Sequence, residues 1–147
     1  MIRRFGEPLV QGQKYHLRAG AYAILPLDGR VLVTHQATPQ SEFQLPGGGI
    51  DAGESALRAL HREVFEETGW GIAAPRRIGA FRRFAYMPDY DRWAEKFCTI
   101  YIARPTRCFG PPREPGHSAV WMRPDQAAEQ LGNEGDRHFL RQAFRLD

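Results

Sequence analysis

The chain has 147 residues, of which 42% are hydrophobic and 25% are charged, and its formal net charge is +3. This is the composition of an ordinary globular protein, and one domain over residues 1–147 would bury roughly two-thirds of its unfolded surface. No apolar run approaches the roughly 20 residues of a membrane span, and the basic N-terminus lacks the apolar core of a secretion signal. We therefore expect a cytoplasmic protein with no membrane partner. Without a basic tail or long charge run, we expect no dedicated nucleic-acid surface.

The first part of the chain predicts a strand hairpin. Residues 17–27 are apolar with small side chains and are expected to form a strand. Asp28-Gly29 is a two-residue hairpin signal, and residues 30–35 return as the partner strand. Residues 43–46 are expected to form a further short strand.

A helix is expected over residues 55–68, after a turn through the three glycines 47–49. Ser55 is a suitable N-cap, Glu54 lies at the positive end of the helix dipole, and Gly69 suits the position after the last turn. The residues expected to face the core follow helical spacing and are Leu57, Leu60 and Val64.

The second half predicts more strands and two closing helices. The expected strands cover residues 72–74, 77–86, 97–103 and 118–122. The expected loops cover residues 87–93 and 106–116, and the expected helices cover residues 124–131 and 134–145. Cys98 and Cys108 have no Cys-x-x-Cys spacing and are expected to be reduced thiols in or near a strand. The order of elements predicts an α/β fold, with a mixed sheet between helical layers.

Three glutamates stand at an unfavourable place in the expected central helix. Glu63, Glu66 and Glu67 lie near its C-terminus, where the helix dipole disfavours negative charge. Glu63 and Glu67 are also four residues apart, a spacing at which like charges repel by roughly 0.2–0.5 kcal/mol. Because carboxylates at these spacings converge on one volume, a divalent cation is the simplest compensation.

The spacing around these glutamates resembles a known motif. Residues 48–70 match every fixed position of the Nudix box, with Gly48, Glu54, Arg62-Glu63, Glu66-Glu67 and Gly69 at the required separations. The one departure is Trp70, which stands where the pattern usually has Ile, Leu or Val and which we interpret as a packing variation. The resemblance implies a Nudix-type α/β/α sandwich with a mixed central sheet.

The resemblance also implies a reaction. Nudix hydrolases cleave a pyrophosphate bond in a nucleoside diphosphate linked to another group, by water attack on phosphorus. The expected metal ligands are Glu63, Glu66, Glu67 and the Gly47 carbonyl, which would hold Mg²⁺ or Mn²⁺. Family members also make a homodimer plausible, although the sequence itself shows none.

Several roles within the expected site stay open at the level of sequence. Arg62 could pair with Glu66, four residues on, or hold Glu54 instead. Glu67 is our first choice for the base that deprotonates water, and Glu114 is an alternative from a later loop. His117 could contact substrate, although a surface histidine with no role in the site is the more ordinary interpretation. Glu95 is a weaker candidate of the same kind as Glu114.

Substrate contacts are expected from the segment after the helix. The four arginines that could bind phosphate are Arg76, Arg77, Arg82 and Arg83. In a strand, Arg82 and Arg83 must point to opposite faces, so both cannot serve one site. The aromatic residues that could stack on a base are Tyr86, Tyr90 and Trp93. We adopt Arg82, Arg83, Tyr86 and Glu114 as candidate substrate-binding residues.

Two other functions compete with hydrolysis. A Nudix-like binding module would sense a nucleotide without turning it over, but such proteins typically lose box glutamates, and here the box is whole. An isomerase or other diphosphate enzyme on the same scaffold is the third hypothesis, because fold alone does not determine function. No motif selects one nucleotide substrate.

Overall fold

A computed structural model describes residues 2–146, which form two β-sheets and three α-helices. The strands of the larger sheet, in spatial order, are β1 (Arg3–Gly6), β7 (Trp70–Met87), β8 (Arg92–Cys108), β2 (Tyr15–Ile24) and β6 (Gly47–Gly49). Parallel pairs β1–β7 and β2–β8 alternate with antiparallel pairs β7–β8 and β2–β6, so this sheet is mixed, as expected.

The smaller sheet is antiparallel and centres on β4 (Arg30–Gln36). Its other strands are β3 (Pro26–Leu27), β5 (Glu42–Gln44) and β9 (His117–Met122). β9 pairs with β4 along six residues, so a strand near the end of the chain lies beside one near its beginning.

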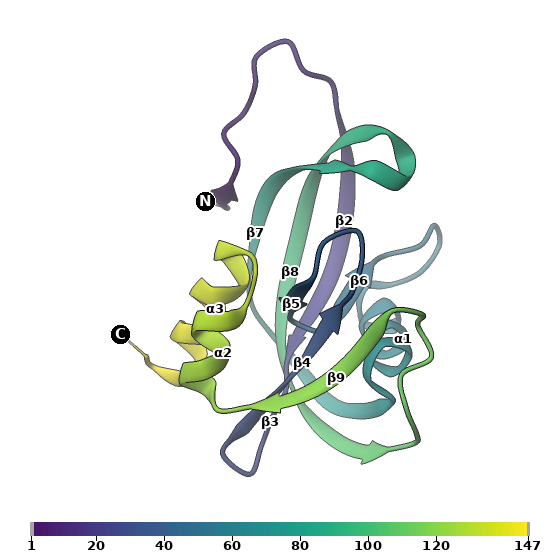
Figure 1. Cartoon of the computed structure of the whole chain (residues 1–147), viewed down its shortest axis with the longest axis vertical. Helices are drawn as coiled ribbons and strands as arrows, with labels where there is room; N and C mark the ends of the chain where they lie inside the picture. The colour runs from purple at the N-terminus through teal and green to yellow at the C-terminus, as the bar shows by residue number, and fades with distance from the viewer. Residues whose placement is uncertain (1, 147) are drawn as a thin grey trace.

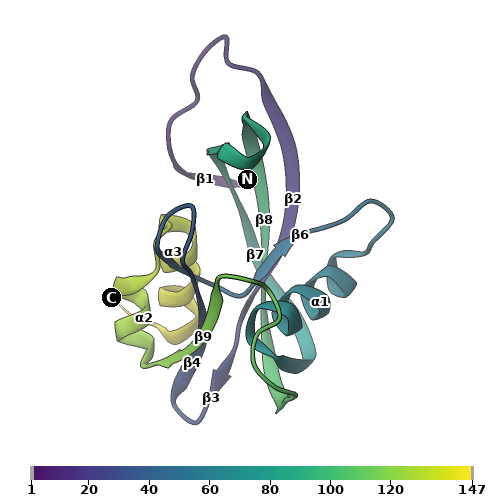
Figure 2. The ribbon, with the colours of Figure 1, turned by 45° about the vertical axis from the view of Figure 1, so that its right-hand side comes forward.

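The helices lie on two sides of the strands (Figure 1). α1 (Ala56–Thr68) lies on one side, and α2 (Pro124–Gln130) and α3 (Glu134–Phe144) lie together on the other, an arrangement that the turned view also shows (Figure 2). A short 3₁₀ turn, η1 (Pro88–Tyr90), joins β7 to β8. The predicted α/β/α arrangement is therefore confirmed. No helix within residues 2–146 combines the length and hydropathy of a membrane span.

Each helical layer covers its own hydrophobic core. On the α1 side, Leu60 and Val64 are fully buried and pack with apolar residues of β2 and β8, such as Ala23 and Ala103. On the other side, Phe139 and Leu140 of α3 belong to the larger core, which fills the space between the sheets. The two cores fix α1 and the sheets relative to each other, and so fix the place where the helix meets β6.

Local chemistry explains the elements that the sequence predicted correctly. Asp28 and Gly29 have φ angles of 51° and 76°, as the predicted two-residue hairpin requires, and β3 and β4 pair on either side of them. Ser55 caps α1 by accepting a hydrogen bond from Arg58 N at 3.1 Å. Gly69 ends the helix at a φ of 79°, a left-handed conformation that glycine adopts without strain.

Several predicted boundaries are wrong. The expected strand over residues 17–27 is divided, because the chain leaves the larger sheet after Ile24 and enters the smaller one at Pro26, which has no N–H for a ladder. The two strands expected over residues 72–86 are one strand, β7, with three register shifts along its pairing with β8. These bulges absorb the irregular stretch around Pro75, so the ladder continues through it.

The two loops expected beside β8 are correspondingly shorter. β8 extends from Arg92 to Cys108, which leaves residues 109–116 as the second loop and η1 as most of the first. Both cysteines lie in β8 and both are free, Cys98 buried and Cys108 exposed.

The predictions for the glycines and for Leu57 are also wrong. Gly47–Gly49 form the edge strand β6, hydrogen-bonded to β2, instead of a turn. Leu57 is 44% exposed because it lies in the first turn of α1, outside the packed face formed by Leu60 and Val64.

Candidate active site

The candidate site forms where the C-terminal half of α1 meets β6. Gly47 N donates a hydrogen bond of 3.0 Å to Glu67 Oε1, and the Glu67 side chain is buried, with 6% of the residue exposed. A Cβ on Gly48 would lie 2.5 Å from Glu63 Cδ, so only a glycine here lets that carboxylate lie directly against the strand. Two box glutamates therefore contact two glycines of β6.

Arg62 connects the acidic groups around this contact. Its Nε and Nη2 donate to the two oxygens of Glu54 at 2.7 and 2.9 Å, and Nη1 donates to Glu63 Oε1 at 2.9 Å. The same guanidinium reaches Glu66 Oε2 and Asp51 Oδ2 at 3.4 Å, and Gly49 O at 3.2 Å. Both alternatives for Arg62 therefore hold, with the bidentate pair to Glu54 as its tightest contact.

The contacts of Glu54 differ from those expected of a charge that only faces the start of the helix. Ser55 takes the N-cap role, while Glu54 accepts hydrogen bonds from Arg62 and from Asp51 N. The hydrogen bonds from Arg62, then the one from Asp51 N, lower the pKa of Glu54 to about 2. Glu54 is therefore ionised at all ordinary pH values and fixes the guanidinium.

Burial perturbs the other carboxylates in the opposite direction. Burial is the main cause that raises the pKa of Glu67 well above its usual range; the Gly47 N–H opposes it, and Glu63, Glu114 and Glu66 add to it. Burial also raises the pKa of Glu63, and Arg62 partly compensates. A buried carboxyl with a raised pKa beside other carboxylates is a group suited to accept a proton near neutral pH.

The last turn of α1 is capped by the loop before β9. Glu66 O accepts hydrogen bonds from Arg113 N and Glu114 N at 2.7 and 2.8 Å. This capping holds the backbone of Glu114 at the helix end, while the residue itself is exposed. The backbone of Glu114 therefore lies beside the end of α1 that carries the glutamates.

His117, the first residue of β9, lies deeper than expected. Its Nδ1 lies 3.7 Å from Glu67 Oε2 and 3.2 Å from Thr34 Oγ1, and its side chain is 13% exposed. The interpretation of His117 as a surface histidine is therefore wrong. Burial lowers its pKa, an effect that the charge of Glu114 opposes.

The site has the donor chemistry for a hard divalent cation. Carboxylate oxygens and backbone carbonyls are the ligands that Mg²⁺ and Mn²⁺ prefer, and the Gly48 position leaves room for the Glu63 carboxylate. Within residues 2–146, no group of three Asp, Glu, His or Cys side chains is already arranged to hold a metal ion. Arg62 draws Glu63 and Glu66 to itself, while Glu67 turns to Gly47. A cation would therefore compete with Arg62 for these oxygens.

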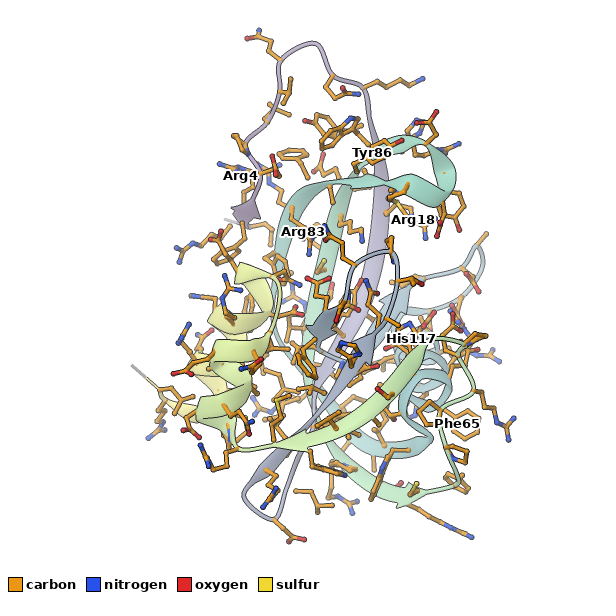
Figure 3. The ribbon with its side chains drawn as sticks, in the orientation of Figure 1. Arg4, Arg18, Phe65, Arg83, Tyr86 and His117 are labelled. Atoms are coloured by element: carbon orange, nitrogen blue, oxygen red, sulfur yellow. The ribbon has the colours of Figure 1, made fainter. Side chains whose placement is uncertain are left out.

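A cavity of about 230 Å³ opens beside the glycine strand. One wall consists of Gly47, Gly48 and Glu67, and the lining also includes Arg83, Lys96 and other polar residues. Arg18 and Arg83 lie on either side of the upper part of this region, and His117 lies below them (Figure 3). Of the box glutamates, Glu67 lines this cavity, so the cavity joins the carboxylates at one wall and can take an anionic ligand beside a cation.

The predicted substrate-binding residues divide between the two faces of β7. Arg83 lines the cavity, whereas Arg82 lies on the opposite face and pairs with Glu95 at 3.6 Å. Tyr86 lines a second cavity of about 230 Å³ together with Tyr90, and its hydroxyl donates to Asp91 Oδ1. Trp93 packs against Tyr86, at 5.5 Å between ring centroids.

Other polar residues of the cavity carried no sequence signal. Asp136 of α3 is buried, accepts a hydrogen bond from Leu45 N at 3.1 Å, and has its pKa raised by burial to about 6. Lys96 of β8 also lines both cavities. Arg76 and Arg77 lie on β7 but outside the lining of either cavity.

Known proteins resemble this chain over both its sequence and its fold. An RNA pyrophosphohydrolase of Halorhodospira halophila is 46% identical over 57 residues, which cover 39% of this chain and 31% of that protein. An 8-oxo-(d)GTP phosphatase of Mycolicibacterium smegmatis is 32% identical over 117 residues, 79% of this chain and 34% of that protein. The chain thus spans less than half the length of these curated relatives.

The crystal structure of a MutT protein from Bacillus halodurans shares the fold. It superposes with a TM-score of 0.69 at 22% identity, covering 84% of this chain and 80% of that one. A model of the NUDIX domain matches residues 14–143, which is most of the chain. The protein therefore belongs to the Nudix family of hydrolases.

Proposed function

We propose that this protein is a divalent-metal-dependent pyrophosphohydrolase. It cleaves a pyrophosphate bond in a nucleoside diphosphate linked to another group, by attack of water on phosphorus. The observation that carries the proposal is the contact of Glu63 and Glu67 with Gly48 and Gly47, beside a polar cavity that both glycines and Glu67 line. The names of the relatives, an RNA pyrophosphohydrolase and an 8-oxo-(d)GTP phosphatase, support a nucleotide substrate.

The residues that would hold Mg²⁺ or Mn²⁺ are the carboxylates of Glu63, Glu66 and Glu67 and the Gly47 carbonyl. The cation, when bound, would polarise the phosphoryl oxygens and neutralise the charge that develops on them. Arg62 is a positioning residue, because it holds Glu54 and Glu63 together and would release oxygens of Glu63 and Glu66 to the cation.

Glu67 is our proposed base. Burial raises its pKa, so its carboxylate binds a proton more readily than an exposed glutamate does. The Gly47 N–H fixes Oε1, which leaves Oε2, on the side of His117, to accept a proton from the attacking water. The charge of Glu114 further raises the pKa of Glu67.

The test is a panel of nucleoside diphosphate derivatives, assayed with both magnesium and manganese at alkaline pH. We expect turnover of at least one class, with products whose phosphate counts identify the cleaved bond. Folded protein that turns over no member of the panel with either metal would overturn the proposal. Tight ligand binding without product, measured by calorimetry, would instead identify a binding module.

A further inference from the structure

Two cations lie opposite each other in the wall of the cavity. Arg83 on β7 and Lys96 on β8 are directly opposite in the antiparallel ladder, on the same face of the sheet. Opposite residues in such a pair have Cβ atoms about 4.5–5.5 Å apart, and like charges there destabilise the sheet. Lys96 is one of only two lysines in the chain, beside Lys14.

Both side chains line the hydrolytic cavity and also the second cavity, which contains Tyr86 and Tyr90. They therefore stand at the boundary between the two spaces. Both residues are partly buried, so solvent screens their mutual repulsion less than it would at the surface.

The part of the chain that the structure describes offers these cations no ion pair within 4 Å. Arg62 and Arg82, by contrast, each pair with glutamates. Asp136, in the lining of the first cavity, accepts a hydrogen bond from Leu45 N, and Glu42, in the lining of the second, accepts one from Gln44 Nε2. Burial and the charge of Arg83 lower the pKa of Lys96, as expected for an ammonium that lacks a partner.

We propose that Arg83 and Lys96 form an anion-binding subsite for a third phosphate of the substrate, beyond the two phosphates of the hydrolysed bond. Arg83 supplies a planar donor pair and Lys96 a point charge, a combination suited to one phosphate. The pair would then select nucleoside polyphosphates over nucleoside diphosphates linked to a neutral sugar. A neutral group at this boundary would leave both cations desolvated and unpaired.

This inference rests on the proposed function, but its first test needs no turnover. Calorimetry would compare inorganic triphosphate with inorganic pyrophosphate, each with magnesium, on the wild-type protein and three variants. The variants are Arg83→Gln, Lys96→Met and the matched control Arg82→Gln, whose side chain lies on the opposite face of β7. Removing one like charge relieves the ladder, so the first two variants should fold.

We expect the wild-type protein to bind triphosphate about tenfold or more tightly than pyrophosphate, the size of one charge-assisted hydrogen bond. Arg83→Gln and Lys96→Met should each remove most of that difference, while Arg82→Gln should keep it. Equal affinity of the wild-type protein for the two anions would overturn the subsite. An equal loss in Arg82→Gln would do so too.

The second test is kinetic and compares a nucleoside triphosphate with a nucleotide sugar. Arg83→Gln should lower kcat/KM for the triphosphate about tenfold, mainly through KM, and leave the nucleotide sugar unchanged. Equal losses on both substrates would overturn the proposed selectivity. If no substrate is turned over, the proposed function fails, and the calorimetric comparison still decides the subsite.

Discussion

Replacing Arg62 with methionine would test its structural role among the carboxylates. Methionine keeps much of the length of the side chain but removes every donor. The change would leave Glu54 without its bidentate partner and Glu63 without the donor that lies 2.9 Å from Oε1. The negative charges of Glu63 and Glu66 would then face each other without compensation.

The size of the effect is worked from the contact between Arg62 and Glu63. Glu63 is 18% and Arg62 30% exposed, so their ion pair is only partly screened by solvent. A hydrogen bond to a charged group contributes roughly 1.5–3 kcal/mol, and we expect the free energy of unfolding to fall by about 2–3 kcal/mol. In a chain of this length, that corresponds to a decrease in Tm of about 5–10 °C.

The assay is urea unfolding, with and without saturating magnesium, and Arg58→Met on the same helix is the control. Arg58 is exposed and forms no ion pair within the described residues, so its loss should change stability by less than about 0.5 kcal/mol. Magnesium should restore part of the stability of Arg62→Met, because the cation takes over the compensation of the carboxylates. This account of the network would be refuted if the two variants were equally stable. It would also be refuted if magnesium did not change the free energy of unfolding of Arg62→Met.

Three further changes test the site and its surroundings. Glu67→Gln should lower kcat by roughly 10²–10⁴-fold, the usual contribution of a positioned base, and circular dichroism should show an intact fold; unchanged turnover would reject the role of Glu67. Gly48→Ala should reduce activity far more than Gly49→Ala, because the new Cβ would lie 2.5 Å from Glu63 Cδ in the first variant and 3.1 Å from Arg18 Nη2 in the second; similar activities would contradict this. The pKa of Asp136 rises from 3.8 to about 6 on burial, so the folded state binds the proton more tightly, and the contribution of Asp136 to stability should be highest below about pH 4 and fall by up to about 3 kcal/mol as pH rises through about 6. Urea titrations from pH 4 to 7 should show this fall, to which Glu63 and Glu67 also contribute, and Asp136→Asn should make the slope clearly smaller; a variant with the wild-type slope would assign it elsewhere.

The sequence predicted best what local chemistry determines. The ends of α1 follow from Ser55 and Gly69, and the hairpin follows from Asp28-Gly29; none of these needs a distant partner. The box glutamates were found from their spacing, from their position at the negative end of the helix dipole and from the match to the box, all of which are local features of the sequence. The hydrogen bond from Gly47 N to Glu67 was not predicted; the sequence indicated only that the glycines and the glutamates approach the same region.

What the sequence could not predict depends on pairing across the fold. Three glycines resemble a turn, and only the ladder with β2 makes them a strand. His117 lies in a segment rich in Pro and Gly, and it is buried because β9 pairs with β4 and brings it to Thr34. Lys96 carries no local signal at all, since its partner across the ladder is 13 positions earlier in the chain.

The electrostatics of α1 explain why the glycines and the glutamates belong together. The helix end, the spacing of four residues and burial all disfavour the negative charge of Glu67, and one N–H from Gly47 compensates only in part, because the pKa of Glu67 is still raised. Arg62 cannot complete the compensation, since its donors are directed to Glu54 and Glu63. The unmet negative charge is therefore concentrated at Glu67, on the wall of the cavity, while the unmet positive charge of Arg83 and Lys96 lines another part of the same cavity. A ligand that carries a cation at one end and a further phosphate at the other satisfies both, and a metal–polyphosphate complex has that distribution of charge.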